Sequence, residues 1–169
     1  ERENYLFFLR RVRKYLVPVL ETIIYCLMPT HYHLLVQVKT SEVSENLGGL
    51  SASKAMMKSA VSYTKAMNKR YNRAGVLFQG PFQAKHVDKD SYLVHLSRYL
   101  HLNPVMAGLV KRPEDWEFSS YREYIGLRDG TLPQPEIVLS QFPSPEAYRE
   151  FVESYTSRER EIIADLLFD

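Results

Sequence analysis

The sequence predicts an α+β fold in which one antiparallel hairpin is accompanied by several helices. Residues 17–28 and 31–39 are rich in apolar, β-branched and aromatic side chains, and a proline-containing turn separates them, which is typical of a β-hairpin. Three other segments carry apolar residues at steps of three and four, which is the period of an amphipathic helix. These helices are expected over residues 3–15, 53–71 and 91–103.

The rest of the chain is expected to consist of loops, one helical turn and a last helix. Loops rich in glycine, proline or polar residues are expected over 40–51, 76–87 and 126–145, of which the second leads into a strand. Asp88 or Asp90 is expected to cap the helix that follows, and Pro104 to help end it. Residues 116–124 predict a helical turn, and 145–167 predict an acidic helix or helix pair.

Length and composition bound the class of protein. A chain of 169 residues is long enough to bury a core, and we expect a domain over residues 1–125 with an extension over 126–169. The single cysteine, Cys26, excludes an internal disulfide and argues against a cysteine-based zinc site. The most apolar stretch, residues 15–28, is too short to span a bilayer, and no secretory signal is visible at the start. We therefore expect a cytoplasmic protein without a membrane partner.

The net charge of +2 conceals a strong segregation of charge along the chain. Residues 51–112 hold eleven basic and two acidic side chains, whereas residues 113–169 hold five basic and thirteen acidic ones. A central basic block of this size favours a polyanionic partner such as a nucleic acid. The acidic end is expected either to form a solvated helical face or to pair with the basic block.

Part of the basic block forms a ridge on one helix. A helical projection of residues 53–71 places four lysines within about 60° of one another, and places Met56, Tyr63 and Met67 on the opposite, core-facing side. A lysine ridge is often only a solvated surface; here no acidic residue interrupts it, so contact with nucleic-acid phosphates is the alternative. The candidate DNA-binding residues are Lys54, Lys58, Lys65, Lys69, Arg73 and Lys85.

Two histidines at the start of the second strand are candidate metal ligands. Side chains alternate along a strand, so His31 and His33 are expected on one face, with Tyr32 on the other. Two imidazoles on one face can bind a single divalent metal ion through one ring nitrogen each. The alternative is a pair of solvent-exposed histidines without a ligand.

A second candidate set lies on the helix over 91–103. At 100° per residue, Tyr99 and Asn103 share one stripe that borders the apolar side of this helix. Asn103 offers a carbonyl oxygen to a hard metal ion, and a tyrosine hydroxyl can attack a phosphate that the same ion polarises. A tyrosine on this border is expected to face the sheet without being fully buried. The alternative is a tyrosine that only packs, because the chain has twelve of them.

Two sequence blocks resemble the signature motifs of a known family. The Met-Pro-Thr-His-Tyr-His-Leu-Leu-Val block (residues 28–36) and the Tyr-Leu-His-Leu-Asn-Pro-Val-Met-Ala-Gly-Leu-Val block (residues 99–110) resemble the motifs of the single-tyrosine HUH transposases. Within that family, they are most similar to the REP-associated tyrosine transposases. Two further blocks, residues 79–83 and 116–121, resemble other parts of the family, and the resemblance extends over roughly residues 3–125.

The resemblance implies a ferredoxin-like fold, with a central antiparallel sheet and helices on one face, for an HUH domain over residues 1–125. It also implies nicking and rejoining of single-stranded DNA beside hairpins, with Mg²⁺ or Mn²⁺ as cofactor. By position, it makes His31 and His33 metal ligands and Tyr99 the nucleophile. Asn103 stands where related transposases have a glutamine ligand, so the third ligand is open. The family's first strand is absent from the sequence, so the sheet is expected to lack one strand.

A non-catalytic nucleic-acid-binding module with a ferredoxin-like sheet is the main alternative. It would account for the basic block and for the aromatic residues, which can stack on bases, but it would leave His31, His33 and Tyr99 without a role. An enzyme acting on small molecules is poorly supported, because the sequence has no glycine-rich phosphate loop and no Gly-x-Ser-x-Gly motif. The oligomeric state is open between monomer and homodimer.

Overall fold

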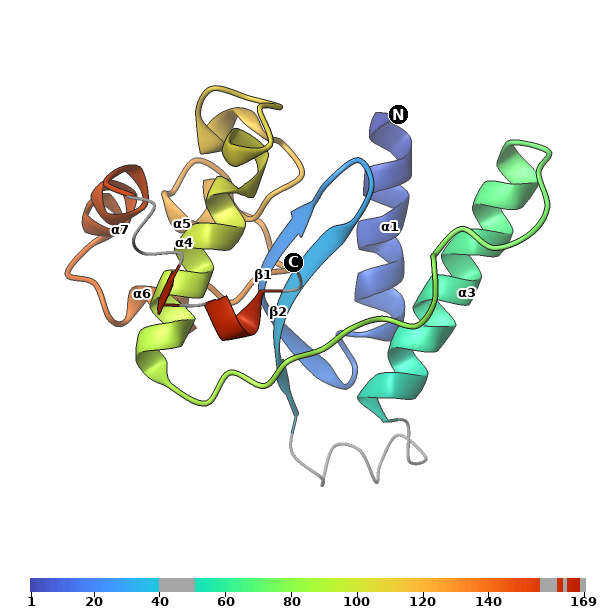
Figure 1. The fold of residues 1–169 in the computed structure, drawn as a ribbon, viewed down its shortest axis with the longest axis horizontal. Coiled ribbons are helices and arrows are strands. Elements are labelled where there is room, and N and C mark those ends of the chain that lie inside the picture. Colours follow the sequence, from blue (N-terminus) through green and yellow to red (C-terminus); the bar gives the residue numbers. More distant parts are fainter. Residues whose placement is uncertain (40–50, 156–160, 163, 168–169) are drawn as a thin grey trace. The chain divides into compact units, whose positions relative to one another are not determined.

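The computed structural model describes residues 1–39, 51–155, 161–162 and 164–167. The loop expected over 40–51 and part of the acidic helix expected near the end therefore lie outside the described residues. The regular elements, in chain order, are α1 (Arg2–Tyr15), β1 (Leu20–Leu27), β2 (Tyr32–Val38), α3 (Ala52–Arg70), α4 (Asp90–Met106), η1 (Pro113–Asp115), α5 (Tyr121–Tyr124), α6 (Glu136–Leu139), α7 (Pro145–Glu153) and η2 (Ala164–Leu166) (Figure 1).

The predicted hairpin is confirmed, and it forms the two-stranded sheet of the described residues. β1 and β2 are its two neighbouring strands, and the Met28 amide donates to the His31 carbonyl at 2.9 Å, which closes the turn between them. β1 is buried at every position except Glu21, as a strand covered on both sides should be. The mixed α/β composition is thus confirmed, while the ferredoxin-like arrangement stays a prediction.

The outer edge of β1 is covered by irregular chain. The Leu27 amide donates to the Phe118 carbonyl at 2.9 Å, and Cys26 and Ser119 form an isolated antiparallel bridge. Further along the same strand, Thr22 forms a parallel bridge with Pro133. These contacts satisfy backbone groups that an open sheet edge would leave exposed.

Four sequence-based expectations about the later elements were wrong. Lys89, not Asp88 or Asp90, stands at the N-cap of α4, and no side chain caps the helix. α4 also continues past Pro104 to Met106, because a proline in the last turn removes only one hydrogen bond. Within the described residues, 76–87 lead into no strand, and the loop expected over 126–145 contains the short helix α6.

The chain divides into two compact units, of which the first is Glu1–Glu21 with Val36–Gln83. In it α1 packs against α3: the rings of Phe8 and Tyr63 meet edge to face at 5.3 Å, and Arg11 donates to the Ser62 hydroxyl at 3.3 Å. α3 begins at the N-cap Ser51, whose hydroxyl accepts from the Lys54 amide. Most of the other charged residues of both helices are exposed.

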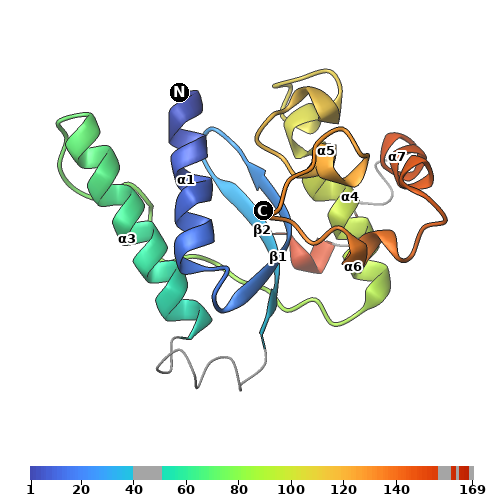
Figure 2. The same ribbon diagram turned by 180° about the vertical axis from the view of Figure 1, so that it is seen from behind.

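The second unit comprises Thr22–Leu35 and Ala84–Asp169, and it is built around α4 (Figure 2). Every residue from Leu96 to Pro104 is buried, so this part of α4 is enclosed on all sides. Its buried cluster includes Leu35 of β2, Tyr124 of α5 and Tyr148 of α7. The predicted boundary near residue 125 stays a prediction, but α7 already shares the core of the unit with α4.

None of the helices in the described part of the chain is both long and apolar enough to cross a membrane.

Candidate functional site

The turn of the hairpin brings the two candidate metal ligands together. His31 directly precedes β2 and His33 is its second residue, so both side chains emerge on one face. Their ring centres lie 4.9 Å apart and the rings are nearly perpendicular, at 84°. The sequence-based expectation that the two imidazoles share a face is therefore confirmed.

His33 has the chemical state that a metal ligand requires. Its Nε2 atom is buried and has no hydrogen-bond partner among the described residues. Burial, reinforced by the neighbouring His31, lowers the pKa of His33 to about 4, so the ring is neutral near pH 7. A buried, neutral nitrogen without a partner carries a free energy cost that a bound ion would remove.

The spacing of the two rings also fits a shared ion. Two imidazoles that bind one ion at about 2.1 Å and at right angles place their ring centres roughly 4.7 Å apart. The observed separation of 4.9 Å is close to this value. No cluster of three or more His, Cys, Asp or Glu side chains suitable for a metal occurs among the described residues.

Tyr99 lies on α4 in the buried cluster that also contains Leu35. Leu35 follows His33 by two residues on β2, so alternation puts both on the same strand face. One buried cluster thus contains side chains of the helix that carries Tyr99 and of the strand that carries His33. Tyr99 is, however, only 8% exposed. Tyr99 is therefore largely but not fully buried, which agrees with the expectation that it would not be buried outright. Its position at the border of the sheet stays a prediction.

Asn103 lies one helical turn after Tyr99, as the sequence indicated. It is 8% exposed, and its carbonyl accepts from the Ala107 amide in the last turn of α4. The structure shows no bond from its side chain to either histidine. Its role as the third ligand stays a prediction.

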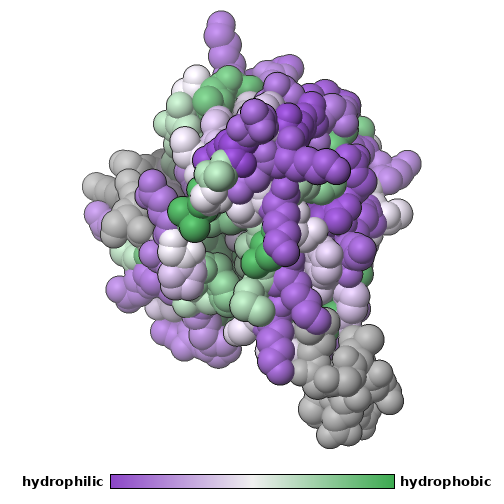
Figure 3. Space-filling view, turned by 90° about the vertical axis from the view of Figure 1, so that its right-hand side faces the viewer, coloured by the Kyte–Doolittle hydropathy of each residue, from purple (hydrophilic) through white to green (hydrophobic). Residues whose placement is uncertain are grey.

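The lysine ridge on α3 is exposed as predicted. Lys54, Lys58, Lys65 and Lys69 are all exposed, and none forms an ion pair with a described acidic side chain. Viewed from the α3 side, hydrophilic side chains cover most of the surface, with apolar patches between them (Figure 3). Apolar residues within the ridge were not anticipated: Met57 is 58% and Val61 47% exposed.

The other two candidate DNA-binding residues differ from one another. Arg73 is exposed in the turn after α3. The Lys85 ammonium group, in the second unit, donates to the backbone carbonyls of Asp165, at 2.8 Å, and Leu167. A phosphate would therefore have to share the Lys85 ammonium group with these carbonyls or replace them. Sequence reasoning did not anticipate the carbonyls, because the first of them lies eighty residues away.

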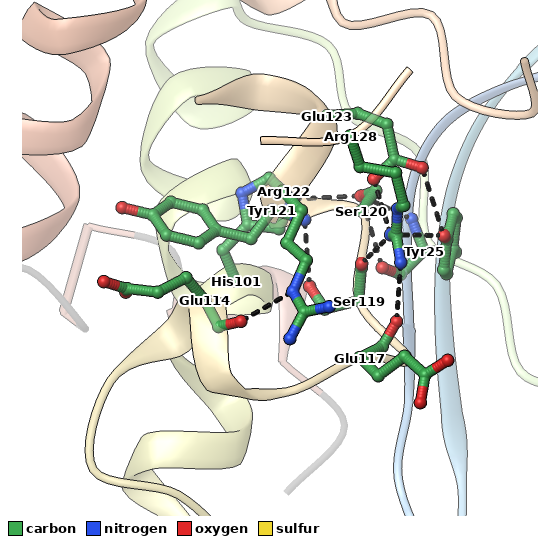
Figure 4. A network of polar contacts seen from close by, with 10 residues as sticks. All are labelled: Tyr25, His101, Glu114, Glu117, Ser119, Ser120, Tyr121, Arg122, Glu123 and Arg128. Carbon is green, nitrogen blue, oxygen red and sulfur yellow. Dashed lines mark hydrogen bonds and ion pairs between the residues drawn. The ribbon is translucent and has the colours of Figure 1, made fainter. Parts of the chain in front are cut away.

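A buried polar network supports α4, and sequence reasoning assigned it no role. His101 is fully buried, with Nδ1 2.7 Å from the Tyr148 hydroxyl and Nε2 3.0 Å from the Ser120 hydroxyl. The Tyr148 hydroxyl in turn donates to Ser97. The Tyr25 amide of β1 donates to Ser120, which Figure 4 shows together with His101. One histidine thus joins α4 to β1 and to α7.

Arg128 closes a second part of this network (Figure 4). Its guanidinium donates to the Glu123 carboxylate at 2.6 Å, to the Tyr25 hydroxyl at 2.8 Å and to the carbonyls of Glu117 and Ser119. Four acceptors from three segments hold the chain that covers the edge of β1. In the sequence, the only sign of this network is the block over residues 116–121, which resembles the family but suggests no role for Arg128.

Comparison with known proteins supports the resemblance at a distance. The chain is 26% identical over 104 residues to a Haemophilus influenzae protein provisionally named as a REP-associated tyrosine transposase. The match covers 60% of this chain and 58% of the relative, so the chain spans little more than half of that protein's length. No family model and no solved structure matches the chain.

Proposed function

We propose that this chain is a metal-dependent enzyme that nicks and rejoins single-stranded DNA beside hairpins, with Tyr99 as its nucleophile. The observation that carries the proposal is the pair of perpendicular imidazoles, one with a buried and unpartnered Nε2. It is supported by Leu35, which follows His33 on β2 and shares a buried cluster with Tyr99. The distant similarity to a protein named as a tyrosine transposase supports the same class of reaction.

His31 and His33 would hold the cofactor, and Asn103 would offer its side-chain oxygen as third ligand. When bound, a divalent ion would polarise the scissile phosphate. Mg²⁺ and Mn²⁺ are both suitable for phosphate chemistry, but two imidazoles favour Mn²⁺, because Mg²⁺ strongly prefers oxygen ligands.

The chain's own part in the reaction is nucleophilic attack by Tyr99. The tyrosine oxygen forms a bond to phosphorus while the bond between phosphorus and the adjoining nucleotide's oxygen breaks. The leaving oxygen takes up a proton, and the phenolic proton is released to solvent. The resulting phosphotyrosine stores the ester bond, so attack by a nucleotide hydroxyl rejoins the strand and restores Tyr99.

The partner in this proposal is single-stranded DNA that contains a hairpin. The exposed lysines of α3 would contact its phosphates, together with Arg73 and, once its carbonyl partners are released, Lys85. The protein would act as a monomer or as a homodimer. Both states are compatible with a site formed by residues of a single unit.

A non-catalytic nucleic-acid-binding module is the second candidate. The observation in its favour is the burial of Tyr99, which is 8% exposed within the core cluster. Such a module would use the basic ridge alone, and Tyr99 would only fill space.

Removing the Tyr99 hydroxyl decides between the two. We expect Tyr99→Phe to abolish both nicking and the covalent protein–DNA adduct when it is incubated with Mn²⁺ and a hairpin-flanked single strand. The ring is retained, so the melting temperature should stay close to that of the unchanged protein. Tyr92→Phe is the matched control, since Tyr92 lies on the same helix with its hydroxyl near the Lys89 ammonium group. An adduct with Tyr99→Phe would favour the binding module.

Removing one metal ligand gives an independent check. We expect His33→Ala to abolish cleavage while binding of the hairpin strand, measured by fluorescence anisotropy, remains. The reason is that the lysines of α3 bind phosphate without the ion. Full cleavage by His33→Ala would show that the histidine pair is not the catalytic metal site.

A further inference from the structure

The hydroxyl group of Thr30 lies beside one of the two candidate ligands. Thr30 belongs to the turn between the strands, and its Oγ1 is 3.1 Å from Nδ1 of His31. The backbone hydrogen bond from Met28 to His31 holds the same turn closed. The hydroxyl and the imidazole are therefore held next to one another by the hairpin itself.

A metal ion distinguishes between the two nitrogens of an imidazole. A neutral ring carries one proton, and only the nitrogen without the proton can bind an ion. A hydrogen bond from the protonated nitrogen to an acceptor fixes the tautomer and the orientation of the ring. A hydroxyl oxygen beside Nδ1 can accept that proton's hydrogen bond and so leave the Nε2 lone pair available.

We propose that Thr30 is a positioning residue, which accepts a hydrogen bond from Nδ1–H of His31 and thereby directs Nε2 of His31 to a divalent ion shared with His33. The inference rests on the proposed function, because it concerns the same metal site. It agrees with the geometry of the partner ligand, since the unpartnered nitrogen of His33 is also Nε2 and its ring centre is 4.9 Å from that of His31.

The two histidines differ in their need for such support. His33 is half-buried within β2, where the strand and its neighbours restrict the ring. His31 is exposed and precedes the strand, so packing does little to choose its rotamer or tautomer. The hydrogen bond with Thr30 would restrict the ring of His31, as packing restricts the ring of His33. Ordering the exposed ring before the ion arrives lowers the entropy cost of binding.

Metal affinity tests the role of the hydroxyl directly. We would titrate the protein with Mn²⁺ and follow the free ion by electron paramagnetic resonance. Thr30→Val keeps the shape but removes the acceptor, and we expect it to weaken Mn²⁺ binding roughly tenfold to a hundredfold. Thr30→Ser restores the hydroxyl and should bind within about twofold of the unchanged protein. Thr131→Val, at an exposed threonine outside the site, is the control.

The tautomer of His31 provides a second readout that does not depend on the ion. In the ion-free protein, imidazole ¹⁵N shifts should show Nδ1 of His31 protonated, and Thr30→Val should shift the ring toward the Nε2–H tautomer. Equal Mn²⁺ affinity of Thr30→Val and the unchanged protein would overturn the inference, as would loss of affinity in Thr30→Ser. Absence of Mn²⁺ binding in the unchanged protein would instead overturn the proposed function.

Discussion

His101 shows how a single residue can couple the core to pH. Both of its ring nitrogens are hydrogen-bonded within the core, and three tyrosine rings surround it, those of Tyr121, Tyr124 and Tyr148. Burial lowers its pKa to about 3, so the folded protein holds this ring neutral. Protonation at Nε2 or Nδ1 would place an unpaired charge among aromatic rings.

A test of this residue is the dependence of stability on pH. The folded-state pKa of about 3 lies below the unfolded value of about 6.5, so the unfolded chain binds the extra proton between these values. The contribution of the neutral His101 ring to the free energy of unfolding is therefore fully present above pH 6.5 and is lost as the pH falls toward 3. Between pH 7.5 and 4.5, the free energy of unfolding should fall by on the order of 2–3 kcal/mol through this residue.

Chemical denaturation of a matched pair of variants isolates this contribution. We expect the difference in free energy of unfolding between the unchanged protein and His101→Gln to shrink as the pH falls from 7.5 to 4.5, because glutamine does not titrate. His86→Gln, at an exposed histidine, is the control substitution. A constant difference between the two proteins across this range would mean that His101 is not held neutral by burial.

At the scale of single elements, α3 has a buried face and an opposite face that carries the exposed lysines. Ala55, Ser59 and Met67 are buried, and the lysines lie on the exposed side. The two apolar residues within the ridge, Met57 and Val61, lie close in projection to Lys54 and Lys58. The exposed face of α3 is thus basic with an apolar strip beside the lysines.

The dependence of DNA binding on salt measures how many of these lysines touch phosphate. Each single-strand phosphate neutralised contributes about 0.7 to the slope of log affinity against log salt concentration. If Lys58 and Lys65 each contact one phosphate, the double variant Lys58→Gln/Lys65→Gln should reduce the slope by about 1.4. Lys111→Gln, an exposed lysine outside α3, is the control. A slope that does not change would show that the ridge only faces solvent.

At the scale of the whole molecule, the acidic end of the chain takes part in the core. Tyr148 and Val152 of α7 are fully buried in the cluster that contains Tyr99. Arg98 of α4 donates to the Phe151 carbonyl at 3.0 Å, and its guanidinium lies 3.9 Å from the centre of that residue's ring. α7 therefore stabilises the helix that carries the proposed nucleophile.

Shortening the chain tests this dependence. A protein ending at Tyr155 loses η2 but keeps α7, and it should still unfold cooperatively. A protein ending at residue 125 exposes the apolar surface of α4 that α6 and α7 cover, and we expect it to lose cooperative unfolding and to bind a hydrophobic dye. Circular dichroism and dye fluorescence provide the measurement. Cooperative unfolding of the shorter protein would show that residues 1–125 form an independent domain.

The sequence alone determined the features that depend on local periodicity. The pairing of His31 with His33 depends only on the alternation of a strand, and the exposure of the four lysines depends only on the period of a helix; the structure confirms both. The extents of α1, α3 and both strands followed from the same patterns to within three residues at each end. Such features require no knowledge of which distant segments meet.

Only the tertiary structure decided how deeply each residue is buried and which distant groups it meets. Periodicity gave α4 one apolar side, but contacts with α5, α6 and α7 surround much of it, and Tyr99 is only 8% exposed. The carbonyls beside Lys85 come from residues 165 and 167, and the support of His101 comes from Ser120 and Tyr148. These contacts join segments separated by nineteen to eighty-two residues, and a local pattern cannot encode them because they depend on how whole elements pack.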